Sequence, residues 1–256
     1  CRPSVVAPAT ESCNGLDDDC DGVLDNDARR LQICGPCPYN TAFISVLPQT
    51  GGSVTEFLCV DWYEASRPDA TATDPGTNEL YTLPRAGVLP WVALTPEEAD
   101  GVCRGEPLRA VVRPGQTPIA TRRLCKSFEW KQACGGTTGT VAERQFPYSE
   151  RGGAGDVFVA GACVDGSTPR TGPALTGETD SCCVAVGARD DVLCDMVGNV
   201  AEYVDGPGGV VVVAGGSYGD TDESILSCGD GVRYQPVPAD ALERDDIGFR
   251  CCGPRR

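Results

Sequence analysis

The chain has 256 residues, of which 41% are hydrophobic and 23% charged, so it is long and apolar enough to bury a sizeable core. Its 32 glycines, 20 prolines and 6% aromatic residues are typical of short elements joined by many turns, and they exclude a helical bundle or a coiled coil. The formal net charge of -16 repels nucleic acid and anionic membrane surfaces and excludes polyanions as partners.

Two residue counts limit the chemistry that the chain can perform and the compartment in which it folds. The chain has no histidine, which excludes imidazole bases, Cys-His and Ser-His dyads and histidine-ligated metals. Its 16 cysteines predict disulfides made in an oxidising compartment, and the bias toward arginine over lysine indicates a GC-rich bacterial genome. The longest purely apolar run, Val210 to Ala214, is too short to cross a bilayer. We therefore expect an exported bacterial protein, extracellular, periplasmic or on the outer surface.

The chain opens on Cys1, followed by a Pro/Ala/Thr-containing stretch at 2–10 that reads as a flexible tether. An N-terminal cysteine is typical of a processed bacterial lipoprotein, in which it carries the lipid anchor. The alternative is ordinary signal cleavage with Cys1 in a disulfide, since an even number of cysteines can pair completely. Both interpretations stay open.

Residues 11–33 form an acidic segment in which carboxylates recur at alternate positions. The expected calcium ligands are Asp17, Asp19, Asp21 and Asp25, at positions 1, 3, 5 and 9 of a D-x-D-x-D-G-x-x-D loop, with the Val23 carbonyl at position 7. Position 12 is Ala28, where an EF-hand needs a bidentate glutamate, so the loop is more like the short calcium repeats of thrombospondin type 3 and dockerin proteins. The alternative is a solvated acidic linker.

Cys13 and Cys20 lie in this segment as candidates for a disulfide that holds the loop, and two further cysteines form a C-G-P-C motif at 34–37. That motif occurs in thioredoxin, but Pro38 and the residues after it do not continue a helix, so we expect a structural disulfide or two separate bridges. Spacing leaves the pairing open across the chain. The cysteines expected in disulfides are Cys13, Cys20, Cys34, Cys37, Cys59, Cys103, Cys125, Cys134, Cys163, Cys182, Cys183, Cys194, Cys228, Cys251 and Cys252.

Few regular elements are expected in the body of the chain. Thr95 as N-cap, Pro96 and Glu98 predict a helix with a capping box that runs to about Cys103. A second helix is expected over 127–134, ended by two glycines. The β-branched run 210–213 predicts a buried central strand, and 247–251 a closing strand.

Seven segments between Phe57 and Cys252 follow one another in a characteristic order. They are DWYEAS at 61–66, TPEEA at 95–99, RLCKSFEW at 123–130, FPYS at 146–149, DMVGNVAEY at 195–203, GGSY at 215–218 and IGFRC at 247–251. Together they resemble the sulfatase-modifying-factor, or formylglycine-generating-enzyme, family. The resemblance implies that 34–256 is one loop-rich α+β domain of C-type-lectin-like fold, stabilised by disulfides and calcium.

The resemblance also implies a second calcium site around residues 198–202. Asn199 and Glu202 would supply side-chain oxygens, and Gly198 or Val200 a carbonyl. In the alternative interpretation, Asn199 caps a turn and Glu202 is a solvated strand residue.

Catalytic members of this family bind copper with two cysteines placed just after the GGSY-like segment. The matching positions here are Asp220 and Ile225, and the nearest thiol, Cys228, is expected to pair with Cys251 or Cys252. The iron-dependent sulfoxide-synthase branch needs three histidines, which are absent. A catalytic carboxylate pair is neither located nor excluded by the sequence.

Two hypotheses for function follow. In the first, the chain is a non-catalytic binding or surface-assembly protein with Ca²⁺ as its only cofactor and proteins or its own copies as partners. Loops after Gly135 and around 206–209 would present the surface. In the alternative, it is a copper-dependent oxidase with an atypical ligand pair, Cys182-Cys183 or Cys251-Cys252. Sugar binding is not expected, because the nearest lectin-like triplet, at 106–108, ends in Leu108.

Overall fold

The computed structural model describes residues 37, 41–46, 56–105, 122–135, 144–149, 156–186, 191–229, 234–238 and 241–254. The acidic calcium loop, Cys1, Cys13, Cys20, Cys34 and the expected boundaries at 10 and 33 lie outside the described residues. Predictions that fall there stay predictions.

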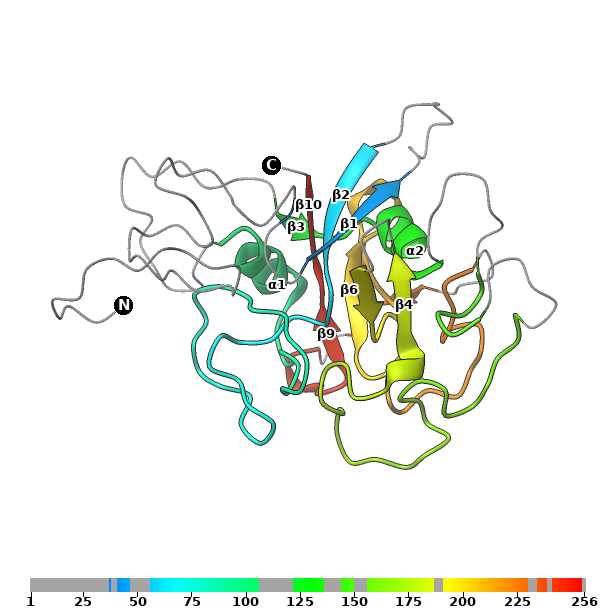
Figure 1. The fold of residues 1–256 in the computed structure, drawn as a ribbon. Coiled ribbons are helices and arrows are strands. Elements are labelled where there is room, and N and C mark those ends of the chain that lie inside the picture. Colours follow the sequence, from blue (N-terminus) through cyan, green and yellow to red (C-terminus); the bar gives the residue numbers. More distant parts are fainter. Residues whose placement is uncertain are drawn as a thin grey trace, which may run out of the picture.

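The described chain is a mixed α+β structure of short elements (Figure 1). Its strands are β1 (Thr41–Val46), β2 (Glu56–Asp61), β3 (Arg123–Leu124), β4 (Cys183–Val186), β5 (Asp191–Cys194), β6 (Ala201–Asp205), β7 (Val211–Ala214), β8 (Gln235–Pro236), β9 (Ile247–Phe249) and β10 (Cys251–Pro254). Its helices are α1 (Pro96–Cys103), α2 (Ser127–Gly135) and three 3₁₀ turns, Asp180–Cys182, Pro207–Gly209 and Ala241–Glu243.

The strands form two four-stranded sheets and one hairpin. The first sheet has the order β1-β2-β10-β3 with antiparallel pairs, and the second has the order β8-β7-β6-β9, in which β6 and β9 are parallel. Strands β4 and β5 pair only with each other. Strands β9 and β10 follow one another with Arg250 between them, so one C-terminal segment belongs to both large sheets.

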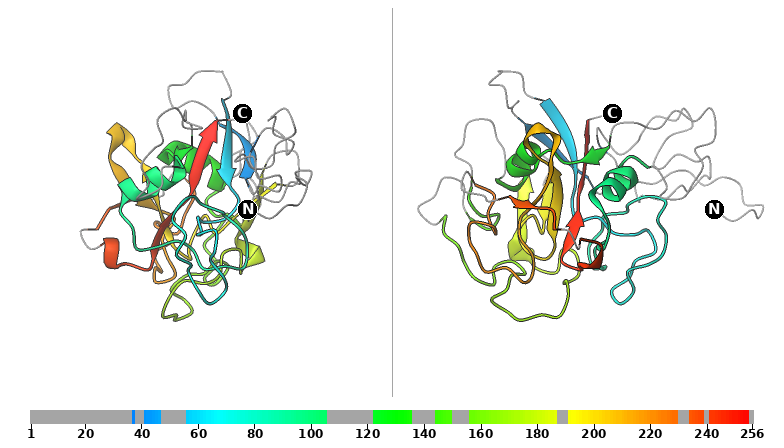
Figure 2. Two further views of the ribbon diagram at one scale, coloured as in Figure 1. Left: turned by 90° about the vertical axis from the view of Figure 1, so that its left-hand side faces the viewer. Right: turned by 180° about the vertical axis from the view of Figure 1, so that it is seen from behind.

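Helices α1 and α2 lie on opposite sides of this C-terminal segment (Figures 1 and 2). One hydrophobic cluster contains Trp130 of α2, and the other contains Trp91 and Phe249, whose ring centroids are 5.9 Å apart. Cys251 belongs to the second cluster and Cys252 to the first, because successive strand residues point to opposite faces.

Local sequence signals predicted the helices well. Thr95 Oγ1 accepts a hydrogen bond from Glu98 N at 3.2 Å, and Glu98 Oε2 accepts one from Thr95 N at 2.9 Å, which confirms the capping box. Helix α2 ends one residue beyond the expected Cys134. The expected strand at 210–213 is shifted by one residue to β7, and the expected closing strand is interrupted at Arg250.

Six disulfides connect the described cysteines, all of which are bonded. The pairs are Cys37–Cys59, Cys103–Cys251, Cys125–Cys252, Cys134–Cys228, Cys163–Cys182 and Cys183–Cys194. Neighbouring cysteines bond to separate partners, as expected. The predicted pairing of Cys228 with Cys251 or Cys252 is wrong. Helix α1 and the residue after strand β3 bring Cys103 and Cys125 to β10, and Cys228 bonds to Cys134 of α2. In the C-G-P-C motif, Cys37 bonds to Cys59 rather than to Cys34.

Among the described residues, no helix is long and apolar enough to cross a membrane.

Two glycines of nearly equal φ provide a test of how tightly the core is built. Gly198 has φ +77°, and a Cβ there would lie 2.4 Å from the Val164 carbonyl oxygen, whereas Gly208 has φ +76° and open space around it. We expect Gly198→Ala to lower the free energy of unfolding by about 3 kcal/mol, from backbone strain and overlap together. Gly208→Ala should cost about 1 kcal/mol, from the unfavourable φ alone. If urea denaturation gives equal losses of unfolding free energy for the two variants, the overlap with the Val164 carbonyl contributes nothing to the cost.

Candidate functional site

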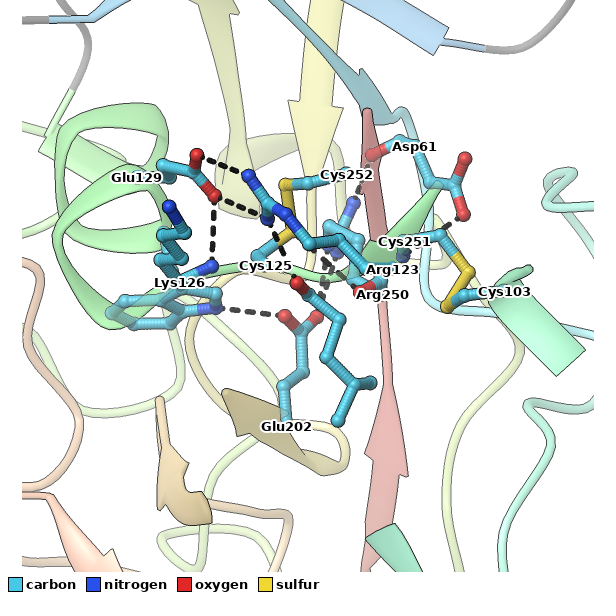
Figure 3. Close-up of a disulfide and its surroundings, with 12 residues drawn as sticks. Asp61, Cys103, Arg123, Cys125, Lys126, Glu129, Glu202, Arg250, Cys251 and Cys252 are labelled. Atoms are coloured by element: carbon cyan, nitrogen blue, oxygen red, sulfur yellow. Dashed lines mark hydrogen bonds and ion pairs between the residues drawn. A yellow bond between two sulfur atoms is a disulfide. The ribbon is translucent and has the colours of Figure 1, made fainter. Parts of the chain in front are cut away.

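A buried ion pair lies between the two large sheets. Arg250 and Glu202 are 0% and 1% exposed, and Arg250 Nε donates to Glu202 Oε1 at 3.0 Å. The other carboxylate oxygen, Oε2, accepts a hydrogen bond from Trp130 Nε1 at 2.7 Å (Figure 3). Both oxygens of Glu202 are therefore engaged by donors from α2 and from the C-terminal segment.

The remaining donors of Arg250 reach two further strands. Nη1 donates to the Asp61 carbonyl at the end of β2, and Nη2 to the Cys194 carbonyl at the end of β5, each at 2.6 Å. One guanidinium thus connects β2 and β6, one from each large sheet, with β5 of the hairpin. A planar guanidinium suits such a junction, since its three nitrogens carry donors in fixed directions and reach acceptors on three different strands.

Asp61 completes this cluster from the other side. Its carboxylate accepts a hydrogen bond from the Cys251 amide at 3.1 Å and forms an ion pair with Arg122. Close by, Arg123 binds both oxygens of Glu129 at 2.7 and 2.6 Å, beside the Cys125–Cys252 disulfide (Figure 3). The residues that Figure 3 shows are thus linked mainly to one another, which is typical of a structural network rather than a site for a guest.

Burial sets the electrostatics of the cluster. It raises the pKa of the Glu202 carboxyl, and the Arg250 charge opposes that rise. Burial alone would lower the pKa of Arg250, but the charge and hydrogen bond of Glu202 raise it above its ordinary value. Both groups are therefore held as an ion pair by each other.

A second buried carboxylate organises the predicted Gly198–Glu202 segment. Glu64 Oε2 accepts a hydrogen bond from Asn199 Nδ2 at 2.6 Å, and Oε1 accepts one from Val200 N at 2.9 Å. Asn199 Oδ1 accepts one from Ala174 N at 2.7 Å, and Asn199 itself has φ +54°. Asn199 therefore connects a turn to two distant segments. Burial and the charges of Asp195 and Glu202 raise the pKa of Glu64 well above its ordinary range.

These contacts test whether residues 198–202 suit calcium. The Asn199 oxygen is taken by a backbone amide, and both Glu202 oxygens are taken by Trp130 and by a guanidinium cation. A calcium ion needs several oxygens converging on one point and would lie against the positive charge of Arg250. Within the described residues, no group of three or more His, Cys, Asp or Glu is arranged to hold a metal ion. The segment therefore does not fit the ion that the resemblance implies.

The positions of the family's copper ligands are also occupied by structural contacts. Asp220 Oδ2 accepts hydrogen bonds from Ser217 N at 2.8 Å and Ser217 Oγ at 3.0 Å, closing the turn after the two glycines. Ile225 is buried, and Cys228 is bonded to Cys134 of α2. This turn thus presents no thiol.

A cleft lies between regular elements on the described surface, and we call it the α1–hairpin cleft. Its volume is about 370 Å³, and its lining residues are Pro96, Glu97, Asp100, Arg104, Arg123, Leu124, Asp205, Gly209 and Val211. It separates α1 from the tip of the β6–β7 hairpin, which lie on the same side of the molecule in the left view of Figure 2. A shallower hollow of about 480 Å³ follows the loop 169–173.

The sequence did not reveal the roles of Arg250, Glu64 and Trp130. All three belong to the family-like segments, yet nothing local indicated that Arg250 would pair with Glu202. The absence of any other buried arginine among the described core residues is visible only in the structure. Of the α1–hairpin cleft, the sequence predicted only that the loop at 206–209 would present a binding surface.

Comparisons with known proteins support the fold. No family model matches the sequence, and no curated protein matches it. Among solved structures, variable protein 1 of Treponema denticola superposes with a TM-score of 0.51 at 14% identity, covering 84% of this chain and 94% of that one. At this identity the likeness shows a shared fold.

The first test concerns the buried ion pair. Arg250→Met should lower the free energy of unfolding by about 3–5 kcal/mol, because it leaves the Glu202 charge buried without its partner. The double variant Arg250→Met/Glu202→Gln should recover much of that loss, since the glutamine still accepts from Trp130. Chemical denaturation of the single and double variants measures this. If the double variant is as unstable as the single one, the lost hydrogen bonds of Arg250, and not the unpaired charge, dominate.

The second test concerns Asp195, which accepts a hydrogen bond from Gly177 N. Burial raises the pKa of Asp195 to about 6, although that hydrogen bond opposes the rise. The folded protein therefore binds this proton more tightly than the unfolded chain does. The resulting stabilisation is complete below about pH 4 and is lost as pH rises through about 6, a change of about 3 kcal/mol. Asp195→Asn should flatten the stability profile between these pH values, whereas the exposed substitution Asp180→Asn should not.

Proposed function

We propose that the chain is an exported, calcium-stabilised, non-catalytic binding or structural protein of the bacterial surface. Its region 34–256 would be a sulfatase-modifying-factor-like domain of C-type-lectin-like fold. The observation that carries this proposal is the turn after Gly216, where Asp220 and Ile225 stand at the family's copper positions and Asp220 closes the turn. Without two thiolates at these positions, the turn has no ligands for the copper(I) ion that the family's oxygen chemistry requires.

The cysteines give independent support. The oxidase alternative needs an atypical thiol pair from Cys182-Cys183 or Cys251-Cys252, but each of these four residues is bonded to a separate partner. The thiolates that would bind copper are thus used to connect strands and helices. Six disulfides also fit an oxidising, extracellular location.

The acidic loop is the one calcium site in this proposal. Asp17, Asp19, Asp21 and Asp25 would bind one ion with the Val23 carbonyl, which neutralises a segment that otherwise repels itself. The proposed partners are proteins or further copies of the chain.

Metal and thiol analysis tests this proposal against its alternative. Protein purified without chelator should contain calcium and no copper by elemental mass spectrometry, and no reactive thiols among residues 37–252 after denaturation without reductant. A chelator should lower the melting temperature by several degrees, because calcium bound to the folded state stabilises it. Stoichiometric copper together with two unpaired thiols would establish the oxidase instead.

A matched pair of variants assigns the calcium. Asp19→Asn/Asp21→Asn should abolish the effect of the chelator, whereas Asp180→Asn/Glu223→Gln removes the same charge from exposed positions and should keep it. A chelator effect that survives the first variant would place the ion outside the acidic loop.

A further inference from the structure

The α1–hairpin cleft is lined by both signs of charge, but its basic side chains are already paired. Arg104 Nε donates to Asp100 Oδ2 at 2.7 Å, and Arg123 is bound through two hydrogen bonds to the buried Glu129. The N-terminus of α1 is capped by Thr95 and Glu98. An anion entering the cleft would thus compete with a carboxylate for each of these donors.

Two acidic side chains of the same cleft are in the opposite situation. In the described chain, neither Glu97 nor Asp205 forms a side-chain hydrogen bond or an ion pair, although the charge of Asp205 contributes to raising the pKa of Arg123 in the same cleft. Glu97 lies in the exposed first turn of α1, and Asp205 ends β6 on the facing wall, so the two carboxylates flank the cleft. Three carboxylates, Glu97, Asp100 and Asp205, line the cleft against two arginines, so its excess charge is negative, like that of the whole chain, and favours a cationic guest.

The remaining walls are apolar. Pro96 and Val211 are half-buried there and Leu124 is buried, whereas Val210 beside the cleft is 62% exposed. Gly208 and Gly209 at the hairpin tip have no neighbouring atoms within 4 Å of where a Cβ would stand, so nothing described there blocks entry. A guest that matches these walls has an apolar stem and a cationic head, the properties of a lysine or arginine side chain.

We propose that the α1–hairpin cleft is a docking site for a lysine or arginine side chain of a protein partner. The cation would lie between Glu97 and Asp205, its stem against Pro96 and Val211, and the apolar residues beside it against the exposed Val210. A protein is favoured over a free amine because Val210 extends the apolar surface past the cleft itself. This proposal rests on the non-catalytic binding role proposed above, and it specifies the chemistry of the partner.

Titration with short peptides tests the chemistry. The probe is the blocked peptide Gly-Val-Arg-Val-Gly, with citrulline in place of arginine as a neutral control of the same shape, both followed by calorimetry at physiological salt. We expect the citrulline peptide to bind at least about tenfold more weakly, because it lacks the charge that pairs with the two carboxylates. Equal affinities, or no heat at millimolar arginine peptide, would overturn the proposal. So would free arginine amide binding as tightly as the peptide.

A pair of double variants places the site. Glu97→Gln/Asp205→Asn should weaken binding of the arginine peptide at least about tenfold, whereas Asp180→Asn/Glu223→Gln, with the same change in net charge, should leave it within about twofold. If both double variants weaken peptide binding equally, the peptide is attracted by the net charge of the protein and not by this cleft.

Carbodiimide cross-linking of the corresponding lysine peptide to the unaltered protein gives a direct map, with no variant to fold. Mass spectrometry should find the links on Glu97 or Asp205, and links spread over other exposed acids such as Asp180 would overturn the assignment. Failure of the proposed function shows separately, as copper and unpaired thiols in the same preparation.

Discussion

The fold depends on one buried cation. Arg250 lies between two consecutive strands of the C-terminal segment and supplies hydrogen bonds to β2, β5 and β6. Its charge is compensated by Glu202, and Trp130 occupies the second oxygen of that carboxylate. A fully buried guanidinium is tolerated only when its donors are satisfied, so the ends of these strands must meet at one point. The relative positions of the sheets follow from that requirement.

The disulfides act on the same region from outside. Cys103–Cys251 and Cys125–Cys252 attach α1 and the segment before α2 to the two residues that follow Arg250. The network in Figure 3 is thus enclosed by covalent links, which limits how far its donors and acceptors can separate. This arrangement suits a rigid support for surface loops. Its buried carboxylates, Glu202 and Glu64, accept hydrogen bonds from donors of the protein itself.

Local signals in the sequence were predictive, and long-range ones were not. The capping box of α1 depends on Thr95, Pro96 and Glu98, which are close neighbours, so a three-residue pattern was enough. The calcium hypothesis for Asn199 and Glu202 recognised suitable oxygens, but it had no information on Arg250, 48 residues further along the chain. The pairing of Cys228 failed for the same reason, since its partner on α2 is 94 residues away. Pairings of this kind depend on the completed fold and leave no trace in spacing.

The position of β10 has a consequence for how the protein is made. This strand pairs with both β2 and β3 in the first sheet, and β9 directly before it completes the second. Neither sheet can close until the ribosome has added residues 247–254, and the two buried faces stay exposed on the nascent chain until then. Pairing of segments so distant in sequence is slow and leaves unfolded chains prone to aggregation. Export before folding, followed by oxidation of the cysteines, would let the last strand arrive before the disulfides fix the arrangement.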